Sequence, residues 1–327
     1  MRTHTRWGLP LLTLFSALWA CGPSPNPDAA DLVLTNGKVV TVDPDYPEAE
    51  AIAIKGFTIQ AVGTTQEIAA LVGPNTRTID LDGRLAIPGL IDSHGHYMSL
   101  GHSKLILDLT QARTWEEIVG MVGEAAAQAE PGEWILGRGW HQEKWAVVPA
   151  ETVDGVPLHD GLSRVSPENP VNLTHASGHA SFANAMALEL AGIDGTTPDP
   201  DGGTIVKAPD GRPTGLLRET AQRLVGRAIA HSQEGRSSQD IEAEEREAVR
   251  LAGEDALSKG VTSFHDAGSN FATIDFFRRL EEEGNLPVRL YVMVRRESNE
   301  EMATRLPEYK MLPEGNDFLT VRSIKRQ

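Results

Sequence analysis

Two histidines separated by one residue, His94 and His96, are the sharpest chemical feature of the sequence. They follow an apolar segment, residues 85–91, that is interrupted by Pro88 and is typical of a strand. Side chains two positions apart on a strand point to the same face, so both imidazoles can converge on one metal ion. Two surface histidines beside a turn are the alternative. The preceding strand, with Asp92 two residues before His94, favours the metal site.

The other residue types narrow the chemistry that such a site could perform. The single cysteine, Cys21, excludes an intramolecular disulfide and a cysteine-rich zinc site. Metal ligands must therefore be histidines, carboxylates or a modified side chain, and the chain has 10 histidines. Gly-x-Ser-x-Gly, His-Glu-x-x-His and P-loop patterns do not occur, so serine hydrolases, zincins and nucleotide hydrolases lack their local signal.

Length and composition indicate how large the fold that holds these residues can be. With 327 residues, of which 40% are hydrophobic and 23% charged, the chain can bury a core, and its length suggests roughly two domains. The formal net charge of −16 repels phosphate backbones, so we expect no nucleic-acid partner.

The first 20 residues are typical of an export signal. Arg2 and Arg6 precede an apolar stretch from Leu9 to Leu18, which is too short to span a membrane. The segment resembles a bacterial lipoprotein signal, in which Cys21 becomes the acylated first residue and residues 21–30 form a stiff tether. We therefore expect a cell-envelope protein that contacts the membrane only through this lipid. Trp19 is unusual in such a signal and leaves plain secretion open.

Residues 31–88 are predicted to form a small β-sandwich unit. Strands over 32–35 and 38–42 are separated by Asn36-Gly37, which favours a tight hairpin. Two more turns of this kind are expected at Lys55-Gly56 and Asp82-Gly83. A unit of this size is marginal by itself.

The remainder of the chain is predicted to alternate helices and strands. Thr114 and Glu117 form a capping-box pattern that opens a helix to about residue 129, and strands are expected at 134–137 and 171–174. A hairpin around 204–206 and a long, solvated acidic helix over 238–259 follow. From residue 260 onward, strands at 261–264, 288–292 and 318–324 are separated by helices at 271–283 and near 300, which favours parallel pairing.

Several ordered motifs resemble the amidohydrolase superfamily, and more narrowly its amidohydrolase 3 branch, which includes N-substituted formamide deformylase-like proteins. The resemblance extends from about residue 31 to the end of the chain. The motifs are Leu85–His96, Gly137–Trp140, Gly178–Ala180 followed by Asn184, Pro213–Glu219, Gly260–Gly268 and Val321–Lys325.

The resemblance implies an α/β fold built on a (β/α)₈ TIM-like barrel with the small β-sandwich unit at its N-terminus. Residues 89–327 would form the first half of the barrel, with a large α+β insertion at about 97–259 after the first barrel strand. The superfamily also takes two histidines and an aspartate from later strands, for which this sequence has no match. We therefore expect a truncated version of a longer enzyme that is inactive as given.

The resemblance implies a metal centre and its ligands. His94 and His96 would bind a divalent ion, expected to be zinc, and Lys325 would be carboxylated by CO₂ to bridge a second ion. An ordinary cationic residue is the alternative for Lys325.

Four further residues would serve the substrate. His179 and His265 are the expected catalytic histidines. A structural histidine at a helix start, packed against Phe182, is an equal alternative for His179, and orientation of a metal ligand is an equal alternative for His265. Trp140 and Asn184 are expected to contact substrate, although tryptophan is more often a core residue.

The predicted reaction is hydrolysis of a non-peptide C–N bond, of the amide or formamide type, in a small molecule by metal-activated water. Two alternatives stay open: an envelope-anchored binding protein without catalysis, and a mononuclear deaminase-like enzyme in which Lys325 is unmodified. Homo-oligomerisation is also left open.

Overall fold

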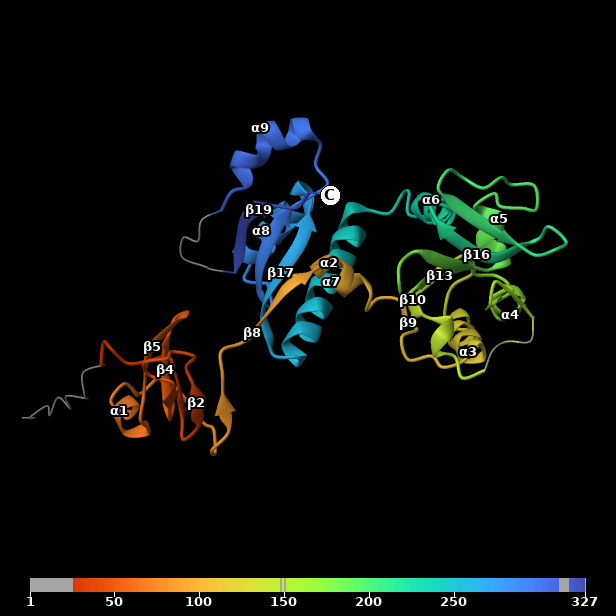
Figure 1. The fold of residues 1–327 in the computed structure, drawn as a ribbon. Helices are drawn as coiled ribbons and strands as arrows, with labels where there is room; N and C mark the ends of the chain where they lie inside the picture. The colour runs from red at the N-terminus through yellow and green to blue at the C-terminus, as the bar shows by residue number, and fades with distance from the viewer. Residues whose placement is uncertain (1–25, 148, 150, 312–317, 327) are drawn as a thin grey trace, which may run out of the picture. The chain divides into compact units, whose positions relative to one another are not determined.

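The computed structural model describes residues 26–147, 149, 151–311 and 318–326 (Figure 1). The chain divides into two compact units, Met1–Pro88 and Gly89–Gln327. The predicted export signal, Cys21 and the first half of the predicted tether lie outside the described residues. Within the described ranges, no helix combines the length and apolar character needed to cross a bilayer.

The N-terminal unit contains two sheets and a short helix, α1 (Thr65–Ala69). Its core is formed by small and branched side chains, among them Val33, Ala51, Ala53 and Ile68. The four-stranded sheet has the order β5 (Thr58–Gly63), β4 (Ala51–Lys55), β1 (Leu32–Thr35), β6 (Arg77–Asp80), and the three-stranded sheet has the order β3 (Glu48–Ala49), β2 (Lys38–Val40), β7 (Leu85–Ala86).

The hairpin predicted around Asn36-Gly37 is wrong. Strand β1 pairs with β4 and β6, whereas β2 pairs with β3 and β7, so the turn carries the chain from one sheet to the other. Asn36 has the positive φ of 53° that the turn needs. A Cβ atom on Gly37 would lie 2.3 Å from Leu81 Cδ1 and 3.1 Å from Arg84 O, so the segment after β6 packs closely on this glycine.

The predicted tether and the β unit overlap in the structure. Ala30 is buried, and its N–H donates to Leu71 O at 2.9 Å. The Thr76 hydroxyl donates to Ala30 O at 2.6 Å. Residues 26–30 therefore pack on the N-terminal unit, which begins before Asp31.

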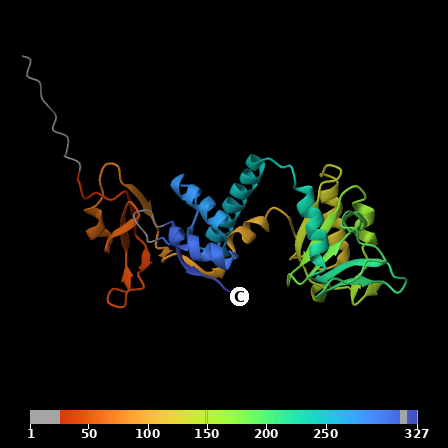
Figure 2. The same cartoon turned by 90° about the horizontal axis from the view of Figure 1, so that it is seen from above.

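The second unit contains a four-stranded sheet in which every pair is parallel (Figures 1 and 2). This confirms the parallel pairing expected from the strand–helix alternation. The strand order is β19 (Leu319–Ile324), β18 (Arg289–Val294), β17 (Val261–Ser269), β8 (Leu90–Gly95). The accompanying helices are α2 (Tyr97–His102), α7 (Ser238–Ser258), α8 (Phe271–Glu282) and α9 (Asn299–Tyr309).

One face of this sheet packs on helices. Phe264, Leu290 and Val321 alternate with less buried residues along their strands and join a core with Tyr97 of α2 and Phe277 of α8. The sheet face opposite this core is therefore the one that can present polar side chains. The observed architecture is a mixed α/β fold.

The insertion, residues 97–259, contributes α2 and α7 and also builds a six-stranded mixed sheet with its own core. Its order is β15 (Gly203–Lys207), β16 (Pro213–Glu219), β14 (Ala180–Ala183), β13 (Val171–His175), β10 (Ile135–Trp140), β9 (Leu107–Asp108). The other elements are α3 (Trp115–Ala126), α4 (Asp160–Val165), α5 (Ala185–Leu190), α6 (Gln222–Ser232), the 3₁₀ turn η1 (Gln142–Lys144) and the hairpin β11 (Thr152–Val153) and β12 (Val156–Pro157).

Local sequence signals place the ends of these elements well. Thr114 caps α3 as predicted, its hydroxyl accepting the Glu117 N–H at 3.0 Å. The reciprocal half of the capping box is not formed, because the Glu117 carboxylate accepts the N–H of Arg113 instead. The predicted strands at 134–137 and 171–174 and the hairpin near 204 are confirmed.

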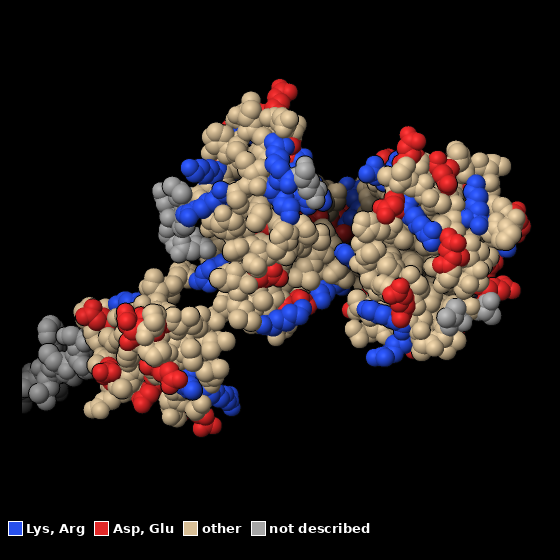
Figure 3. Space-filling view, viewed as in Figure 1, with Lys and Arg blue, Asp and Glu red and all other residues tan. Residues whose placement is uncertain are grey.

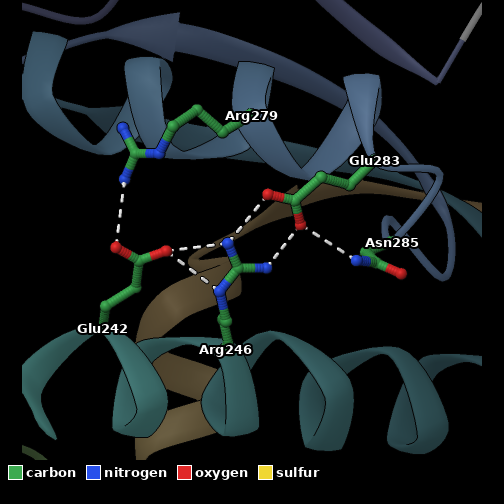
Figure 4. Close-up of polar contacts among 5 residues, drawn as sticks. All are labelled: Glu242, Arg246, Arg279, Glu283 and Asn285. Atoms are coloured by element: carbon green, nitrogen blue, oxygen red, sulfur yellow. Dashed lines mark hydrogen bonds and ion pairs between the residues drawn. The ribbon is translucent and has the colours of Figure 1, made fainter. Parts of the chain in front are cut away.

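Charged side chains of both signs are present on the face shown in Figure 3. On α7, Glu242 and Arg246 form the i,i+4 pair expected of a solvated helix face, at 2.7 Å. Arg246 also reaches Glu283 after α8, at 2.6 Å, and Arg279 approaches Glu242 (Figure 4). Hydrogen bonds from Arg246, and then from Asn285, lower the pKa of Glu283 to about 2.

Candidate metal centre and substrate pocket

His94 and Lys325 meet although they come from the two outer strands of the parallel sheet. His94 lies in β8, and Lys325 directly follows β19. Their Nε2 and Nζ atoms are 3.2 Å apart. Neighbouring strands are about 4.8 Å apart, so the outer strands of a flat sheet of four would be separated by roughly 14 Å. The two side chains therefore reach toward each other across one face of the sheet.

His96 lies beside this pair. The backbone is still extended at His96, the residue after Gly95 at the end of β8, which continues the alternation that the sequence predicts. The rings of His94 and His96 have centroids 6.2 Å apart and are nearly perpendicular. The Asp92 carboxylate accepts the His94 backbone N–H at 3.0 Å, and this hydrogen bond fixes the backbone between Asp92 and His94.

Asp266 on β17 anchors the backbone next to His96. The residue is only 2% exposed, and one carboxylate oxygen accepts the N–H of Tyr97 at 3.0 Å. Its other oxygen accepts the Ser269 hydroxyl at 2.6 Å. Asp266 therefore holds the first turn of α2, and with it His96, against the neighbouring strand. Asp266 lies within the Gly260–Gly268 motif, but nothing in the motif indicates this role.

His96 also lines a small cavity. Its volume is about 160 Å³, and Asp266, Ser269, Arg295 and Arg296 are among its lining residues. Arg296 has a positive φ of 74°, an uncommon backbone conformation for a long side chain. The cavity brings an imidazole, two guanidinium groups and a buried carboxylate together.

His265 lies between Phe264 and Asp266 in β17. Phe264 packs in the core, so strand alternation places His265 on the opposite sheet face. Its ring stacks against Tyr291 of β18, with centroids 4.9 Å apart. Among the described residues this ring contact is the one that orients His265.

His179 lies in the insertion and pairs with Glu219. The His179 Nδ1 and Glu219 Oε2 atoms are 3.0 Å apart, and the histidine side chain is 72% exposed. Glu219 ends β16 with a positive φ of 48°. Sequence analysis named the motif that contains Glu219 but not the pair, since 40 residues separate its two members. A carboxylate partner orients the imidazole, as a proton-transferring histidine requires.

Trp140 and Asn184 have structural partners. The Trp140 indole N–H donates to Leu173 O at 2.8 Å, and its ring stacks on Trp145. Asn184 is fully buried and caps α5 through the Ala187 N–H, while its amide group donates to Ser166 and Asn169. The geometry gives Asn184 the role of a scaffold residue, because its polar atoms are already hydrogen-bonded to the protein. Trp140 is also core, although its edge lines a cavity of the insertion.

The side chains of His94, His96 and Lys325 carry donor atoms of the kinds that bind a divalent metal ion. Two imidazoles and an amine that carboxylation could convert into an oxygen ligand are gathered on one sheet face, and nitrogen and oxygen donors of this kind are typical zinc ligands. In the part of the chain that the structure describes, no three His, Cys, Asp or Glu side chains come together as a metal site.

Comparison with known proteins gives consistent matches. The amidohydrolase family model matches residues 77–326. The chain is 36% identical over 267 residues to Protein LONG AFTER FAR-RED 3 of Arabidopsis thaliana, covering 80% of this chain and 43% of that protein. It is 31% identical over 268 residues to the putative amidohydrolase YtcJ of Bacillus subtilis, covering 80% and 48%.

A third relative is N-substituted formamide deformylase of Arthrobacter pascens, at 30% identity over 262 residues, with 80% and 46% covered. Among solved structures, an uncharacterised metal-dependent hydrolase from Pyrococcus horikoshii shares the fold, with a TM-score of 0.62 and 22% identity over 90% of this chain and 53% of that one. The chain thus spans about half the length of the relatives that it matches. With a family match over most of its length, the chain belongs to the amidohydrolase family, in the amidohydrolase 3 branch.

Proposed function

We propose that this protein contributes the His94, His96 and Lys325 part of the active site of a metal-dependent hydrolase that cleaves a non-peptide C–N bond, of the amide or formamide type, in a small molecule. The observation that carries the proposal is the 3.2 Å approach of Lys325 Nζ to His94 Nε2 across the sheet. The distance is that of a hydrogen bond between the lysine amine and the imidazole, and it also brings the two groups as close together as ligands of one metal centre must lie.

In this proposal each described side chain has a separate task. His94 and His96 would hold a divalent cation, for which zinc is the expected identity, and Lys325 would hold a second through a carbamate. A bound divalent cation supplies Lewis acidity and lowers the pKa of a water ligand toward neutrality. Asp266 would keep His96 in place, and His265 would support the ligands from the same sheet face.

His179 would serve the substrate from the insertion. The Glu219 carboxylate accepts from Nδ1, so Nε2 is an acceptor in the neutral ring and can donate to a carbonyl oxygen or to a leaving nitrogen when the ring is protonated on both nitrogens. Because the chain spans about half of its relatives' length, turnover is proposed for a protein that carries the complete set of ligands.

We further propose that the parallel sheet is the first half of a (β/α)₈ barrel. The shared fold with the Pyrococcus horikoshii hydrolase supports this, since parallel strands with polar residues at their carboxyl ends are the site-bearing part of such barrels. Export and acylation at Cys21 are also proposed. Cys21→Ser should then release the protein from the membrane fraction of a bacterial host, whereas Ser24→Ala should not.

Metal content tests the central proposal. Purified protein is equilibrated with Zn²⁺, dialysed, and its bound metal measured alongside a variant carrying His94→Ala and His96→Ala. We expect the variant to bind zinc at least about tenfold more weakly, because substitutions that merely disturb a ligand's orientation already have effects of this size. His231→Ala, which removes an exposed histidine of α6 paired with Glu234, is the matched control. Equal zinc affinity in all three proteins would contradict the metal site.

The carbamate has its own test. Isotopically labelled bicarbonate should give a new carbamate carbon resonance in the wild-type protein with Zn²⁺ present, and Lys325→Gln should abolish it. A resonance that persists in Lys325→Gln would assign the modification elsewhere. If the wild-type protein shows no carbamate resonance, the result supports a mononuclear site in which Lys325 is unmodified.

A further inference from the structure

The small cavity beside His96 lies where the parallel strands end. Its volume is about 160 Å³, and Arg295 and Arg296, which directly follow β18, line it together with His96. His96 and Ser99 also line a larger cavity of about 450 Å³, whose other lining residues include Asp108 of β9. A ligand at His96 therefore has access to both cavities.

Two consecutive arginines line the small cavity, which regular strand geometry would not allow. Side chains alternate along a strand, so neighbouring residues point to opposite faces. β18 ends at Val294, and Arg296 has a positive φ of 74°. This turn of the backbone breaks the alternation, and Arg295 and Arg296 line the same cavity. The conformation is unfavourable for a residue with a side chain, so the chain keeps a strained backbone where the two arginines meet.

Gly268 fixes the course of the Arg295 side chain. A Cβ atom on Gly268 would lie 2.4 Å from Arg295 Cδ and 2.6 Å from Arg295 Cβ, so the stem of the arginine lies directly on the glycine. Both residues line the cavity. The Arg295 backbone N–H donates to Ser269 O at 2.9 Å and holds the residue at the same place. The arginine is therefore positioned by β17 along the cavity wall.

The cavity has an excess of positive charge. Its acidic lining residue is Asp266, which is 2% exposed and already accepts a hydrogen bond at each carboxylate oxygen. The neighbouring Glu297 carboxylate accepts the Phe271 N–H at the start of α8. Two guanidinium groups thus line the cavity with one buried carboxylate, in a chain whose formal net charge is −16. One additional negative charge would balance them.

A carboxylate is the anion that suits this cavity. Guanidinium groups bind carboxylates through paired N–H donors. A carboxylate brings the single negative charge that balances the cavity, whereas a phosphate dianion would exceed it and lie beside Asp266. The volume is also below the range of whole-ligand sites, which indicates that the cavity receives one group of a larger molecule.

We propose that this cavity binds a carboxylate carried by the substrate, with Arg295 and Arg296 donating to its oxygens while the rest of the molecule extends past His96 into the larger cavity. The inference rests on the proposed function for the reaction at His96, whereas the anion site depends on the two arginines. It narrows the substrate class to amides or formamides that carry a carboxylate close to the C–N bond, and it makes Arg295 and Arg296 specificity-determining residues.

N-formylglycine tests the proposal, because one carbon joins its formamide to its carboxylate. Its dissociation constant is measured by ligand-observed NMR on the full chain after metal removal with EDTA and dialysis. N-formylglycinamide, in which a neutral amide replaces the carboxylate, is measured beside it. We expect N-formylglycine to bind at least about tenfold more tightly, a factor that corresponds to 1.4 kcal/mol. Arg295→Gln and Arg296→Gln should each remove most of this preference.

Arg289→Gln is the matched control. Arg289 begins β18, at the opposite end of the strand from the cavity, and its guanidinium lies over the Phe318 ring. Its substitution removes the same charge and should leave the preference for N-formylglycine unchanged.

Arg296→Gly separates ligand binding from a structural role. Glycine adopts the positive φ of 74° without strain, so the urea midpoint of this variant should be no lower than that of wild type. Binding of N-formylglycine should nevertheless weaken as it does in Arg296→Gln. The comparison of the two ligands on wild-type protein stands even if a variant fails to fold.

Equal affinity for N-formylglycine and N-formylglycinamide, or no binding of either, would overturn the inference. So would a preference that survives in both Arg295→Gln and Arg296→Gln, or inorganic phosphate that binds more tightly than N-formylglycine. Because the measurement is made without metal, these outcomes leave the proposed metal centre untouched, and a failed metal-binding test leaves the carboxylate site intact.

Discussion

The carboxylate of Asp266 illustrates how a single buried group can hold a site together. It accepts the Tyr97 N–H directly after His96 and the Ser269 hydroxyl, and it is nearly inaccessible to solvent. The sequence places it next to His265, but only the fold brings it to a backbone N–H that is 169 residues away.

Replacing Asp266 should therefore affect both stability and the site. Asp266→Ala leaves the Tyr97 N–H buried and unpaired, and we expect it to reduce the free energy of unfolding by about 2–3 kcal/mol. Urea denaturation measures this loss. Ser269→Ala removes only the hydroxyl and should cost about 1 kcal/mol. In addition, Asp266→Ala should weaken zinc binding whereas Ser269→Ala should not, and identical effects of the two variants would argue against an anchoring role for Asp266.

At the scale of elements, the contact between α2 and α7 depends on a glycine. A Cβ atom on Gly101 would lie 2.0 Å from Ala248 O, a backbone atom that cannot rotate away. Gly120 in α3 is also helical, but a Cβ there would meet nothing within 4 Å. The two glycines therefore make a matched pair.

Gly101→Ala should destabilise the protein by about 1–3 kcal/mol, because overpacking forces the two helices apart. Gly120→Ala should instead stabilise it by up to about 1 kcal/mol, since alanine lowers the conformational entropy of the unfolded chain and favours helix. Thermal or urea unfolding gives the sign directly. A loss of stability in Gly120→Ala, or none in Gly101→Ala, would contradict the observed packing.

The link between α7 and α8 predicts a pH dependence. The folded-state pKa of Glu283, about 2, is below its ordinary value of 4.5. Its pairing with Arg246 thus stabilises the protein above pH 4.5, and this stabilisation is lost as the pH falls toward 2. The groups are solvent-exposed, so the contribution is reduced by screening.

Arg246→Gln should raise the pKa of Glu283 toward its ordinary value. We expect the variant to be less stable than wild type at neutral pH and to become equal to it near pH 2, as followed by urea unfolding and by NMR titration of the carboxyl. Arg250 pairs with Glu247 and Glu254 of the same helix, so Arg250→Gln should leave the Glu283 titration unchanged. A Glu283 pKa that stays near 2 in Arg246→Gln would refute the pairing.

At the scale of the whole molecule, the two units have separate cores. Val33 is fully buried in the N-terminal unit, and Leu173 is fully buried among aromatic side chains of the second unit. The described tryptophans, Trp115, Trp134, Trp140 and Trp145, all lie in the second unit. Tryptophan fluorescence therefore reports mainly on that unit, whereas circular dichroism reports on both.

We expect urea unfolding to show more than one transition, as multi-unit chains commonly do. Leu173→Ala should lower the midpoint seen by fluorescence, with a loss of about 2–5 kcal/mol. Val33→Ala should change the circular dichroism curve and leave the fluorescence midpoint in place. A single transition that both variants shift equally would mean that the units unfold as one.

Features that depend on near neighbours along the chain can be predicted from the sequence. The His94 and His96 spacing, the Thr114 cap, the parallel strand–helix rhythm after Gly260 and the family motifs are all readable within a few residues, because strand alternation and helix capping are local rules. The turn at Asn36-Gly37 was also locally correct in its backbone, yet its strands joined different sheets.

Contacts between groups far apart in the sequence depend on the fold of the whole unit. Lys325 lies 231 residues from His94 in the sequence, yet their side chains meet. Strand order and packing likewise decide that Glu219 pairs with His179 and that Asp266 accepts the Tyr97 N–H. They also decide that His175 and Gln142 each have a buried atom without a partner among the described residues. Side-chain spacing carries no information about pairings across a sheet, because these are fixed by burial and by the satisfaction of polar groups over the whole unit. The site was therefore predictable in its histidines and not in the groups that position them.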